Sequence, residues 1–430
     1  MRKSAGIESN FFLCFRACSR RKFMISISEA LSIIEREISA PQTETTDLDK
    51  SIGRVLAEEI CSDMYLPPFD RSQMDGFAVR SEDASSAGKK ASVKLKIIGE
   101  SVAGKGFNEK IKRGEAVRIM TGARVPEGAD AVQKKELARE EKTSEGESFV
   151  EIFEATKARQ NIILKGAEIE AGTKVFDAGE VVTAQMIASL ASFGYAKVKV
   201  SKKPRAAILA TGSEIVAVNK KPRRDQIRNS NSVMLKVFAE KAGAETKVLP
   251  IVRDDIENLK YEIENCLTVC DVLIVSGGVS VGDYDFTKPA LREIGAEIFF
   301  ERISLKPGKP TVFAKLGDTL IFGLPGNPVS VAVTFYLFVR FALLKMQGAS
   351  DCELKKGFAV ATKEIKGAKE RDSFLPVSVE TNAKGKLSIK SLQFGGSSNF
   401  IAFSRANALA FVPQGKNYKS GEIVEVAYLP

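Results

Sequence analysis

The sequence contains no histidine among its 430 residues. Histidine supplies the general base of Ser-His-Asp and Cys-His enzymes, and it is a frequent ligand of zinc. Its absence excludes these kinds of site. Catalysis in this chain must therefore use carboxylates, lysine, backbone amides or a bound metal ion.

Cysteine is also scarce, and its six copies are scattered. Cys14 and Cys18 are four residues apart, as are Cys266 and Cys270, so neither pair forms a CxxC motif. The helical spacing of the second pair favours structural thiols, with a metal or disulfide role as the alternative. This cysteine usage suggests a reducing, cytoplasmic compartment.

Long apolar runs are missing as well. A membrane-spanning helix needs about 18 or more consecutive apolar residues. The nearest run, residues 329–346, is interrupted by Arg340. We interpret it as a buried helix and expect no contact with a membrane.

Charge is unevenly distributed. The formal net charge is +10, but residues 1–23 hold six cations against one carboxylate, a net of +5. The rest lacks a basic stripe with aromatics, so we expect no nucleic-acid partner, and its mild positive balance suits anionic small molecules. Residues 1–23 lack the apolar core of a secretory signal. We interpret them as a disordered extension or an over-called start, with a targeting segment as the alternative.

A chain of this length exceeds one hydrophobic core, so we expect several domains. Residues 26–38 have the pattern of an amphipathic helix with a capping box from Ser26 and Glu29. Residues 64–160 alternate in short stretches typical of β structure. Residues 178–195 predict a helix, and residues 196–200 a strand.

After residues 201–205 the pattern becomes one of alternating strands and helices. Strands are predicted at 206–209, 247–251 and 271–275, and helices at 231–242, 256–266, 287–294 and 328–346. This spacing predicts a doubly wound α/β domain, a parallel sheet with helices on both faces. Residues 357–430 return to short alternating runs, which predict a small β domain.

Ligands of open parallel sheets bind outside the carboxyl ends of the strands, and we expect four unusual loops there. The first contains Thr211–Glu214, where Gly212 permits a tight turn and Glu214 adds a carboxylate. An ordinary turn is the alternative. Asp254 and Asp255 follow the next predicted strand and could add carboxylates to the same edge.

The second loop is rich in glycine and serine, and it follows a buried strand. Its candidate ligand-binding residues are Ser276, Gly277, Gly278, Ser280 and Gly282. Glycine lets successive backbone N–H groups point into one concavity, which favours an anion. Asp285 follows, either as a helix N-cap or as a ligand of a hard cation such as Mg²⁺. A purely structural turn is the alternative for this loop.

The third loop places Lys306 and Lys309 around a Pro-Gly turn. Prolines stiffen such a turn and hold the two ammonium groups at a fixed separation, which suits an oxyanion. A solvated basic turn is the alternative.

The fourth loop leads into the last helix of the α/β domain. Asn327 is a good N-cap and Pro328 a good first helical residue, so the helix start can offer amides to an anion. Ordinary helix initiation is the alternative. The candidate binding residues here are Pro325, Gly326, Asn327, Pro328 and Ser330. Together the four loops suit a phosphorylated ligand with a divalent metal.

Six segments in order resemble the MoeA family over residues 24–430. They are residues 66–80 (LPPFDRSQMDGFAVR), 118–123 (RIMTGA), 211–214 (TGSE), 276–288 (SGGVSVGDYDFTK), 306–310 (KPGKP) and 323–330 (GLPGNPVS). The resemblance implies an enzyme that inserts molybdate into adenylylated molybdopterin with Mg²⁺, yielding molybdenum cofactor and AMP. It also implies a homodimer, with other cofactor-biosynthesis proteins as further partners.

The resemblance also divides the chain. It implies a linker domain at 24–63 and 160–203, a β-rich domain at 64–159, a MogA-like molybdopterin-binding domain at 204–344 and a C-terminal β domain at 345–430.

Residue roles follow from the same resemblance. Asp75 and Thr121 match residues that reach the site from the partner subunit. Arg371 and Ser397 match positions linked to molybdate. The remaining matches are acidic positions around ligand and metal (Glu214, Asp254 or Asp255, Asp285) and the pterin and molybdate region (Lys306, Lys309, Pro325, Pro328, Ser330).

Three other functions are compatible with parts of the pattern. One is a molybdopterin adenylyltransferase, which would not need the domains outside 204–344. Another is a non-enzymatic, gephyrin-like scaffold, which could dispense with its acidic site residues. A third is a nucleotide pyrophosphatase or amidase, which the pattern around Asp75 does not favour.

Overall fold

The computed structural model describes residues 24–279, 285–390, 392 and 396–430. Within these ranges the chain forms two compact units. One comprises residues 24–44, 53–55 and 201–430, and the other residues 45–52 and 56–200. The predictions for residues 1–23, Ser280 and Gly282 lie outside the described residues.

The first unit contains a six-stranded sheet in the order β16-β13-β17-β21-β20-β18. The strands are β13 (Arg205–Ala210), β16 (Glu245–Val248), β17 (Val272–Ser276), β18 (Glu297–Phe300), β20 (Val312–Leu316) and β21 (Thr319–Leu324). The first four in the sheet are parallel, and β20 and β18 are antiparallel to their neighbours. The sheet is therefore mixed at one edge rather than wholly parallel.

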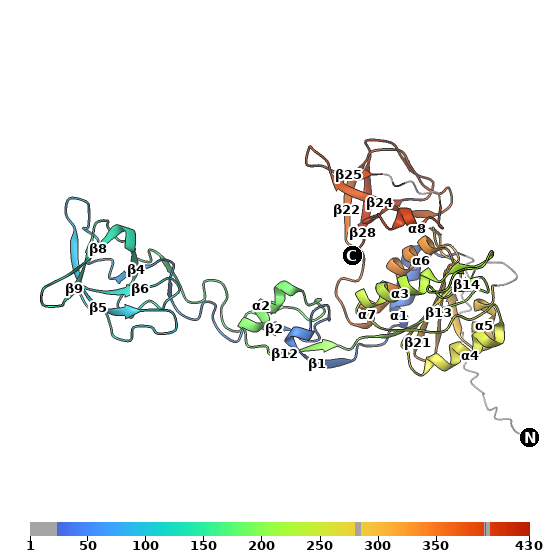
Figure 1. The fold of residues 1–430 in the computed structure, drawn as a ribbon, viewed down its shortest axis with the longest axis horizontal. Coiled ribbons are helices and arrows are strands. Elements are labelled where there is room, and N and C mark those ends of the chain that lie inside the picture. Colours follow the sequence, from blue (N-terminus) through green and yellow to red (C-terminus); the bar gives the residue numbers. More distant parts are fainter. Residues whose placement is uncertain (1–23, 280–284, 391, 393–395) are drawn as a thin grey trace, which may run out of the picture. The chain divides into compact units, whose positions relative to one another are not determined.

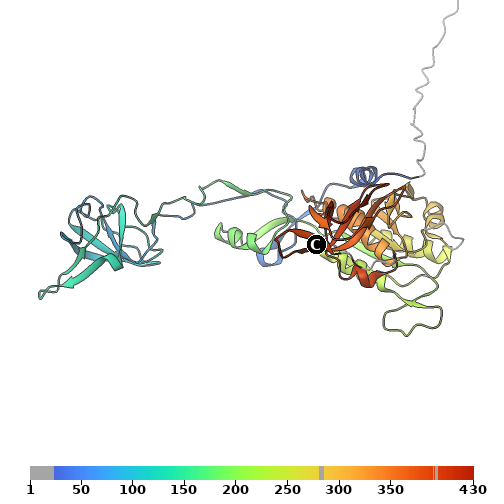
Figure 2. The ribbon, with the colours of Figure 1, turned by 90° about the horizontal axis from the view of Figure 1, so that it is seen from above.

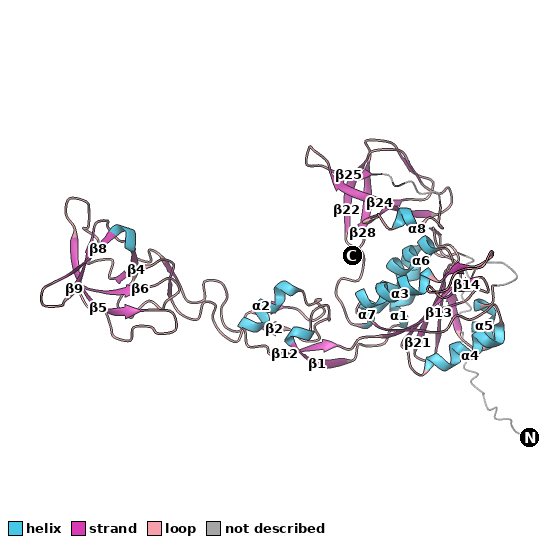
Figure 3. Ribbon diagram, in the orientation of Figure 1, coloured by secondary structure: helices cyan, strands magenta, loops and turns pink. Residues whose placement is uncertain are grey.

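Helices cover both faces of this sheet (Figures 1 and 3). Alternate residues of the strands enter two different cores: Ile208 and Ile274 one, Leu209 and Val275 the other. The first core contains α1 (Ile27–Glu37), α3 (Ser230–Lys241) and the helix that begins at Pro328. The second contains α4 (Ile256–Leu267) and α5 (Thr287–Glu293). The doubly wound arrangement is confirmed.

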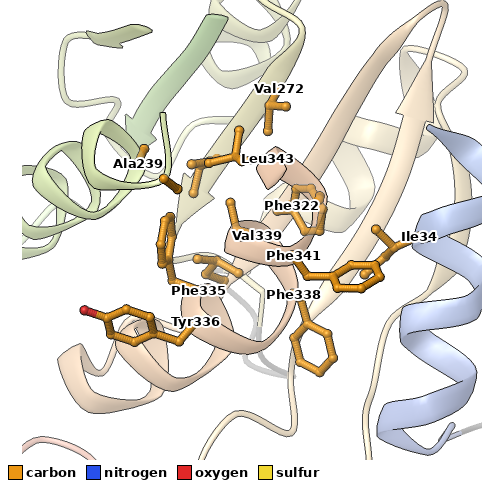
Figure 4. Close-up of a cluster of buried hydrophobic side chains, with 14 of the residues drawn as sticks. Ile34, Ala239, Val272, Phe322, Phe335, Tyr336, Phe338, Val339, Phe341 and Leu343 are labelled. Atoms are coloured by element: carbon orange, nitrogen blue, oxygen red, sulfur yellow. The ribbon is translucent and has the colours of Figure 1, made fainter. Parts of the chain in front are cut away.

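The helix at the centre of the first core runs from Pro328 to Met346 as α6 (Pro328–Thr334), a π turn (Phe335–Val339) and α7 (Arg340–Met346). Figure 4 shows Phe335, Phe338 and Leu343 of this helix beside side chains of the sheet and of α1 and α3. It is the one helix among the described residues that is long and apolar enough to cross a membrane, but 78% of it is buried. The prediction of a buried core helix is confirmed.

Six further strands of this unit form a second sheet around residues 356–428. They are β19 (Leu305–Lys306), β22 (Lys356–Ala361), β24 (Asp372–Thr381), β25 (Leu387–Lys390), β26 (Ala408–Val412) and β28 (Ile423–Tyr428). Because β24 pairs with both β25 and β26, five of these strands close into a barrel. β23 (Ile365–Lys366), β27 (Asn417–Tyr418) and the short helix α8 (Phe400–Phe403) complete it. The predicted C-terminal β structure is present.

A small ribbon lies beside the carboxyl ends of the parallel strands. β14 (Ile215–Val216) and β15 (Ile227–Arg228) pair in parallel, and residues 217–226 connect them. This loop, yellow-green in Figure 2, extends away from the body of the unit.

The second unit holds another six-stranded sheet, in the order β7-β4-β6-β5-β9-β8. Its strands are β4 (Gly76–Val79), β5 (Val93–Ser101), β6 (Glu115–Ile119), β7 (Ala131–Lys134), β8 (Ala138–Lys142) and β9 (Ser148–Ile152). The other elements of this region are α2 (Ala184–Ser192), β1 (Thr43–Asp47), β2 (Ile60–Cys61), β3 (Arg71–Ser72), β10 (Ile162–Ile163), β11 (Lys174–Phe176), β12 (Lys197–Ser201) and two single-turn 3₁₀ helices (Leu48–Lys50, Lys135–Leu137).

Local signals set several element boundaries. The capping box of α1 is confirmed: the Ser26 hydroxyl accepts from the Glu29 amide at 3.1 Å, and Glu29 accepts from the Ser26 amide at 2.9 Å. The helix predicted over 178–195 is shorter, because Thr183 occupies its N-cap and Gly194, with φ of 79°, follows its end.

Candidate functional site

A cleft of about 980 Å³ lies where β13, β17 and β21 end. Its walls come from the first, second and fourth loops predicted from the sequence, from Pro310 of the third, from the β14–β15 ribbon and from residues near α8. Parallel strands present their carboxyl ends at one edge, so loops that are far apart in sequence meet there. The lining residues include Glu214, Asp254 and Asp285 from the strand ends, Arg228 from the ribbon, Asn231 from α3 and Gly326 from the fourth loop.

Three carboxylates line this cleft: Glu214, Asp254 and Asp285. Asp254 accepts from the Ser213 amide at 2.9 Å and from the Thr211 hydroxyl at 3.3 Å, which ties it to the first loop. Asp255 is used differently, because it caps α4 by accepting from the Asn258 amide at 2.9 Å. Within the described ranges no three Asp, Glu, Cys or His side chains form a metal cluster.

The second loop is packed tightly against the first. Gly277 has φ of 105°, and a Cβ atom there would lie 2.5 Å from the Thr211 carbonyl oxygen. Thr287 donates its hydroxyl to the Gly277 carbonyl at 3.1 Å and so holds the other side of the loop. Phe286, rather than Asp285, occupies the N-cap position of α5. Only glycine fits at position 277, so this glycine is required for the close packing of the two loops and not merely for a turn.

The third loop departs from the prediction. Lys306 belongs to β19, which pairs with β24 of the barrel and not with the α/β sheet, so this loop does not follow a strand of the parallel sheet. Lys306 and Lys309 are exposed and do not line the cleft, although Pro310 does. Arg371 lies beside them, since its guanidinium donates to the Leu305 carbonyl at 3.3 Å.

The fourth loop begins its helix as predicted, with Asn327 at the N-cap and Pro328 as the first helical residue. The Asn327 side chain, however, donates to the Ser397 hydroxyl at 3.0 Å instead of capping the helix. The Val329 amide donates to the Ser397 carbonyl at 3.1 Å, so one amide expected to be open to an anion is already used. Ser330 is buried and does not line the cleft.

Asn231, which the sequence interpretation did not single out, joins two of these loops. Its side-chain amide donates to the Ser276 hydroxyl at 3.0 Å and to the Gly326 carbonyl at 2.7 Å. The carbonyl of Gly326 can only accept, so it fixes which end of the Asn231 amide carries the nitrogen. The only sequence signal was a second asparagine two residues after the N-cap Asn229.

In the other unit, Asp75 and Thr121 lie together. The amide and the hydroxyl of Thr121 both donate to one carboxylate oxygen of Asp75, each at 2.7 Å. These bonds, the backbone bond first, lower the pKa of the Asp75 carboxyl below its ordinary value. The Thr121 amide and hydroxyl therefore both favour the ionised form of the Asp75 carboxyl.

Three family models match the chain in sequence order. They are the MoeA N-terminal region (domain I and II) at residues 25–194, a probable molybdopterin binding domain at 207–345 and the MoeA C-terminal region (domain IV) at 359–429. A protein of Haemophilus influenzae named molybdopterin molybdenumtransferase is 36% identical over 406 residues, covering 94% of this chain and 98% of its own length.

The chain belongs to the MoeA family.

Other relatives agree. A molybdopterin molybdenumtransferase of Staphylococcus epidermidis is 34% identical over 94% of this chain and 95% of its own length. The crystal structure of a molybdopterin biosynthesis MoeA protein from Pyrococcus horikoshii superimposes with a TM-score of 0.80 at 29% identity, covering 94% of this chain and all of that one. The predictions of family and fold class are confirmed.

Proposed function

We propose that this chain is a molybdopterin molybdenumtransferase that inserts molybdate into adenylylated molybdopterin and releases AMP. The observation that carries the proposal is the cleft where three carboxylates, two glycines of positive φ (Gly277 and Gly278) and the Pro325–Pro328 turn meet at the strand ends. Family membership over nearly the whole chain supports it, because relatives of matching length carry that name.

The donor set of the cleft suits a ligand that brings its own soft metal ligands. No histidine exists in the chain, and the described cysteines Cys266, Cys270 and Cys352 are buried, while Cys61 lies in the other unit. Molybdenum prefers sulfur, which the pterin's dithiolene would supply. The protein therefore needs only to hold anions, which hydroxyls, amides and cations do well.

A divalent cation such as Mg²⁺ fits this cleft as an ion shared between protein and substrate. Mg²⁺ is commonly held by one or two carboxylates together with substrate phosphates, so a separate three-ligand cluster is not required. One or two of Glu214, Asp254 and Asp285 would hold it, whereas Asp255 is engaged as a helix cap. When bound, it would polarise the phosphoanhydride oxygens of the substrate.

The residues of the chain would perform the remaining tasks. Asn231 holds the Ser276 and Gly326 loops in register around the ligand. Lys306, Lys309 and Arg371 form a basic group beside the cleft that would attract molybdate, a tetrahedral dianion. Ser397 fixes Asn327 at the start of α6 and would keep that turn in place during binding.

We further propose a homodimer in which the partner subunit contributes Asp75 and Thr121 to the reaction. The two hydrogen bonds from Thr121 hold the Asp75 carboxylate in a fixed orientation, in which it could act at the cleft of the partner subunit. A dimeric mass in solution by light scattering is the expected result. A monomeric mass at assay concentration would contradict this part of the proposal.

Asp285→Ala tests the proposed chemistry, and Asp255→Ala, which removes the cap of α4, is the comparison. We expect Asp285→Ala to reduce AMP release by at least roughly 100-fold while leaving the melting temperature unchanged. Asp255→Ala should do the reverse, losing about 1 kcal/mol of stability with the helix cap and keeping turnover. Full turnover in Asp285→Ala would remove Asp285 from the site, and a large fall in melting temperature would make it structural.

A further inference from the structure

The β14–β15 ribbon, Ile215 to Arg228, carries a concentration of positive charge. Its exposed cations are Lys220, Lys221, Arg223, Arg224 and Arg228, and Asp225 is its only acid. None of these cations takes part in an ion pair with any described residue. Like charges placed so close together repel one another, which is a cost that a bound anion would remove.

The backbone of the ribbon is anchored at its base. The Ile227 amide donates to the Glu214 carbonyl and the Asn229 amide to the Val216 carbonyl, both at 2.9 Å. A hydrogen bond from the Arg228 Nε to the Lys220 carbonyl, at 3.1 Å, fixes the orientation of the guanidinium. The ribbon therefore has a fixed root and presents long cationic side chains from a loop that extends outward (Figure 2).

This ribbon is a wall of the cleft. Val218, Pro222, Gln226 and Arg228 all line it. Arg228 is the one lysine or arginine among the lining residues that the structure describes. Lys306 and Lys309, the lysines that the sequence predicted at the site, are not in the lining. The cleft thus has carboxylates on the strand ends and its positive charge on the ribbon.

We infer that the β14–β15 ribbon binds the phosphate chain of the nucleotide substrate, with Arg228 as the contacting residue and the four loop cations raising the local positive potential. The inference rests on the proposed function for the identity of the substrate. A phosphoanhydride bound in the cleft would face Arg228 on the ribbon side, and a divalent ion held by carboxylates of the cleft would offset part of its charge. Arg228 lines the cleft, and the N–H groups of its guanidinium that the Lys220 carbonyl does not engage are well suited to phosphate oxygens.

The test measures binding rather than turnover. Full-length protein with Mg²⁺ is titrated with AMP and with inorganic pyrophosphate in a calorimeter at low and high ionic strength. Three variants are compared with the wild type: Arg228→Gln, the pair Arg223→Gln and Arg224→Gln, and the pair Lys220→Gln and Lys221→Gln. The control is the pair Lys384→Gln and Lys386→Gln, two exposed lysines on the β24–β25 turn of the barrel.

Removing one contacting charge in water-like surroundings weakens binding about 5-fold. We therefore expect Arg228→Gln to weaken the binding of both probes about 5- to 20-fold. Each loop pair should weaken binding about 3-fold, and only at low ionic strength, because salt screens charges that do not touch the ligand. The control pair should bind as the wild type does.

Unchanged affinity in Arg228→Gln, or a wild type that binds neither probe, would overturn the inference. So would loop variants that retain full binding of pyrophosphate but lose binding of polyglutamate, added as a third titrant, since the ribbon would then serve an acidic protein surface. The outcomes also separate this inference from the proposed function. Molybdate-dependent AMP release with an unaffected Arg228→Gln leaves the function standing, whereas weakened phosphate binding without such release leaves only the ribbon site.

Discussion

Asn231 offers a direct test of how the cleft is held together, through the variant Asn231→Ala. The side-chain amide makes two hydrogen bonds, to the Ser276 hydroxyl at 3.0 Å and to the Gly326 carbonyl at 2.7 Å. Each such bond contributes about 0.5–1.5 kcal/mol net, so losing both costs about 1–3 kcal/mol. The low end is expected, because the buried Oδ1 atom of Asn231 has no partner and its removal relieves a penalty.

Thermal unfolding and ligand binding together measure this effect. A loss of about 1–2 kcal/mol corresponds to a fall in melting temperature of roughly 2–8 °C for a unit of this size. Binding of pyrophosphate should weaken as well, because the Ser276 and Gly326 loops lose their common anchor. Asn258→Ala is the control, since Asn258 is an exposed residue of α4 and alanine favours helix there.

The reasoning fails if Asn231→Ala matches the wild type in both melting temperature and binding. It fails in a different way if stability falls but binding does not. Asn231 would then be an ordinary structural residue, and the two loops would keep their register without it.

Two further predictions address other parts of the molecule. Thr121→Val keeps the amide bond to Asp75 but removes the hydroxyl bond, which also lowers the Asp75 pKa, so this pKa rises and the acid limb of the pH–rate profile should move to higher pH. Thr121→Ser should keep the wild-type profile, and an unmoved limb in Thr121→Val would refute a role for ionised Asp75. Gly308→Ala should lower the free energy of unfolding by about 1–3 kcal/mol, because φ is +119° and the new Cβ would lie 2.5 Å from Thr334 Cγ2. In Gly326→Ala the new Cβ would meet no atom within 4 Å, so stability should change little, and equal melting curves for the two variants would contradict the steric argument.

Periodic and local signals explain how much of the fold could be predicted. The helices at 231–242, 256–266 and 287–294 were found within about one residue, because caps and apolar spacing act over a few residues. The antiparallel pair β20 and β21 was missed, although the Gly317-Asp318 turn between two apolar runs is a hairpin signal. That hairpin makes the sheet mixed.

Long-range pairings explain most of what was missed in the site. Nothing near Lys306 reveals that its strand joins residues 372–373 of the barrel, so the position of the third loop could not be read from its own composition. The hydrogen-bond partners of Asn231 lie 45 and 95 residues away in the sequence. The partner of Ser397 lies 70 residues away. The basic run at 220–224 was visible in the sequence, but only the fold shows that it belongs to a loop that contributes Val218, Pro222 and Gln226 to the cleft.

The central claim is that this cleft releases AMP from the phosphoanhydride of the adenylylated pterin as molybdenum is inserted at the dithiolene. The most direct measurement is AMP release from adenylylated molybdopterin by the full-length protein with Mg²⁺, with and without molybdate, together with the molybdenum content of the product. The account predicts AMP release that requires molybdate and a molybdenum-loaded pterin. Tight binding of the substrate without AMP release would contradict it and would favour a scaffold that has kept the cleft but not the reaction.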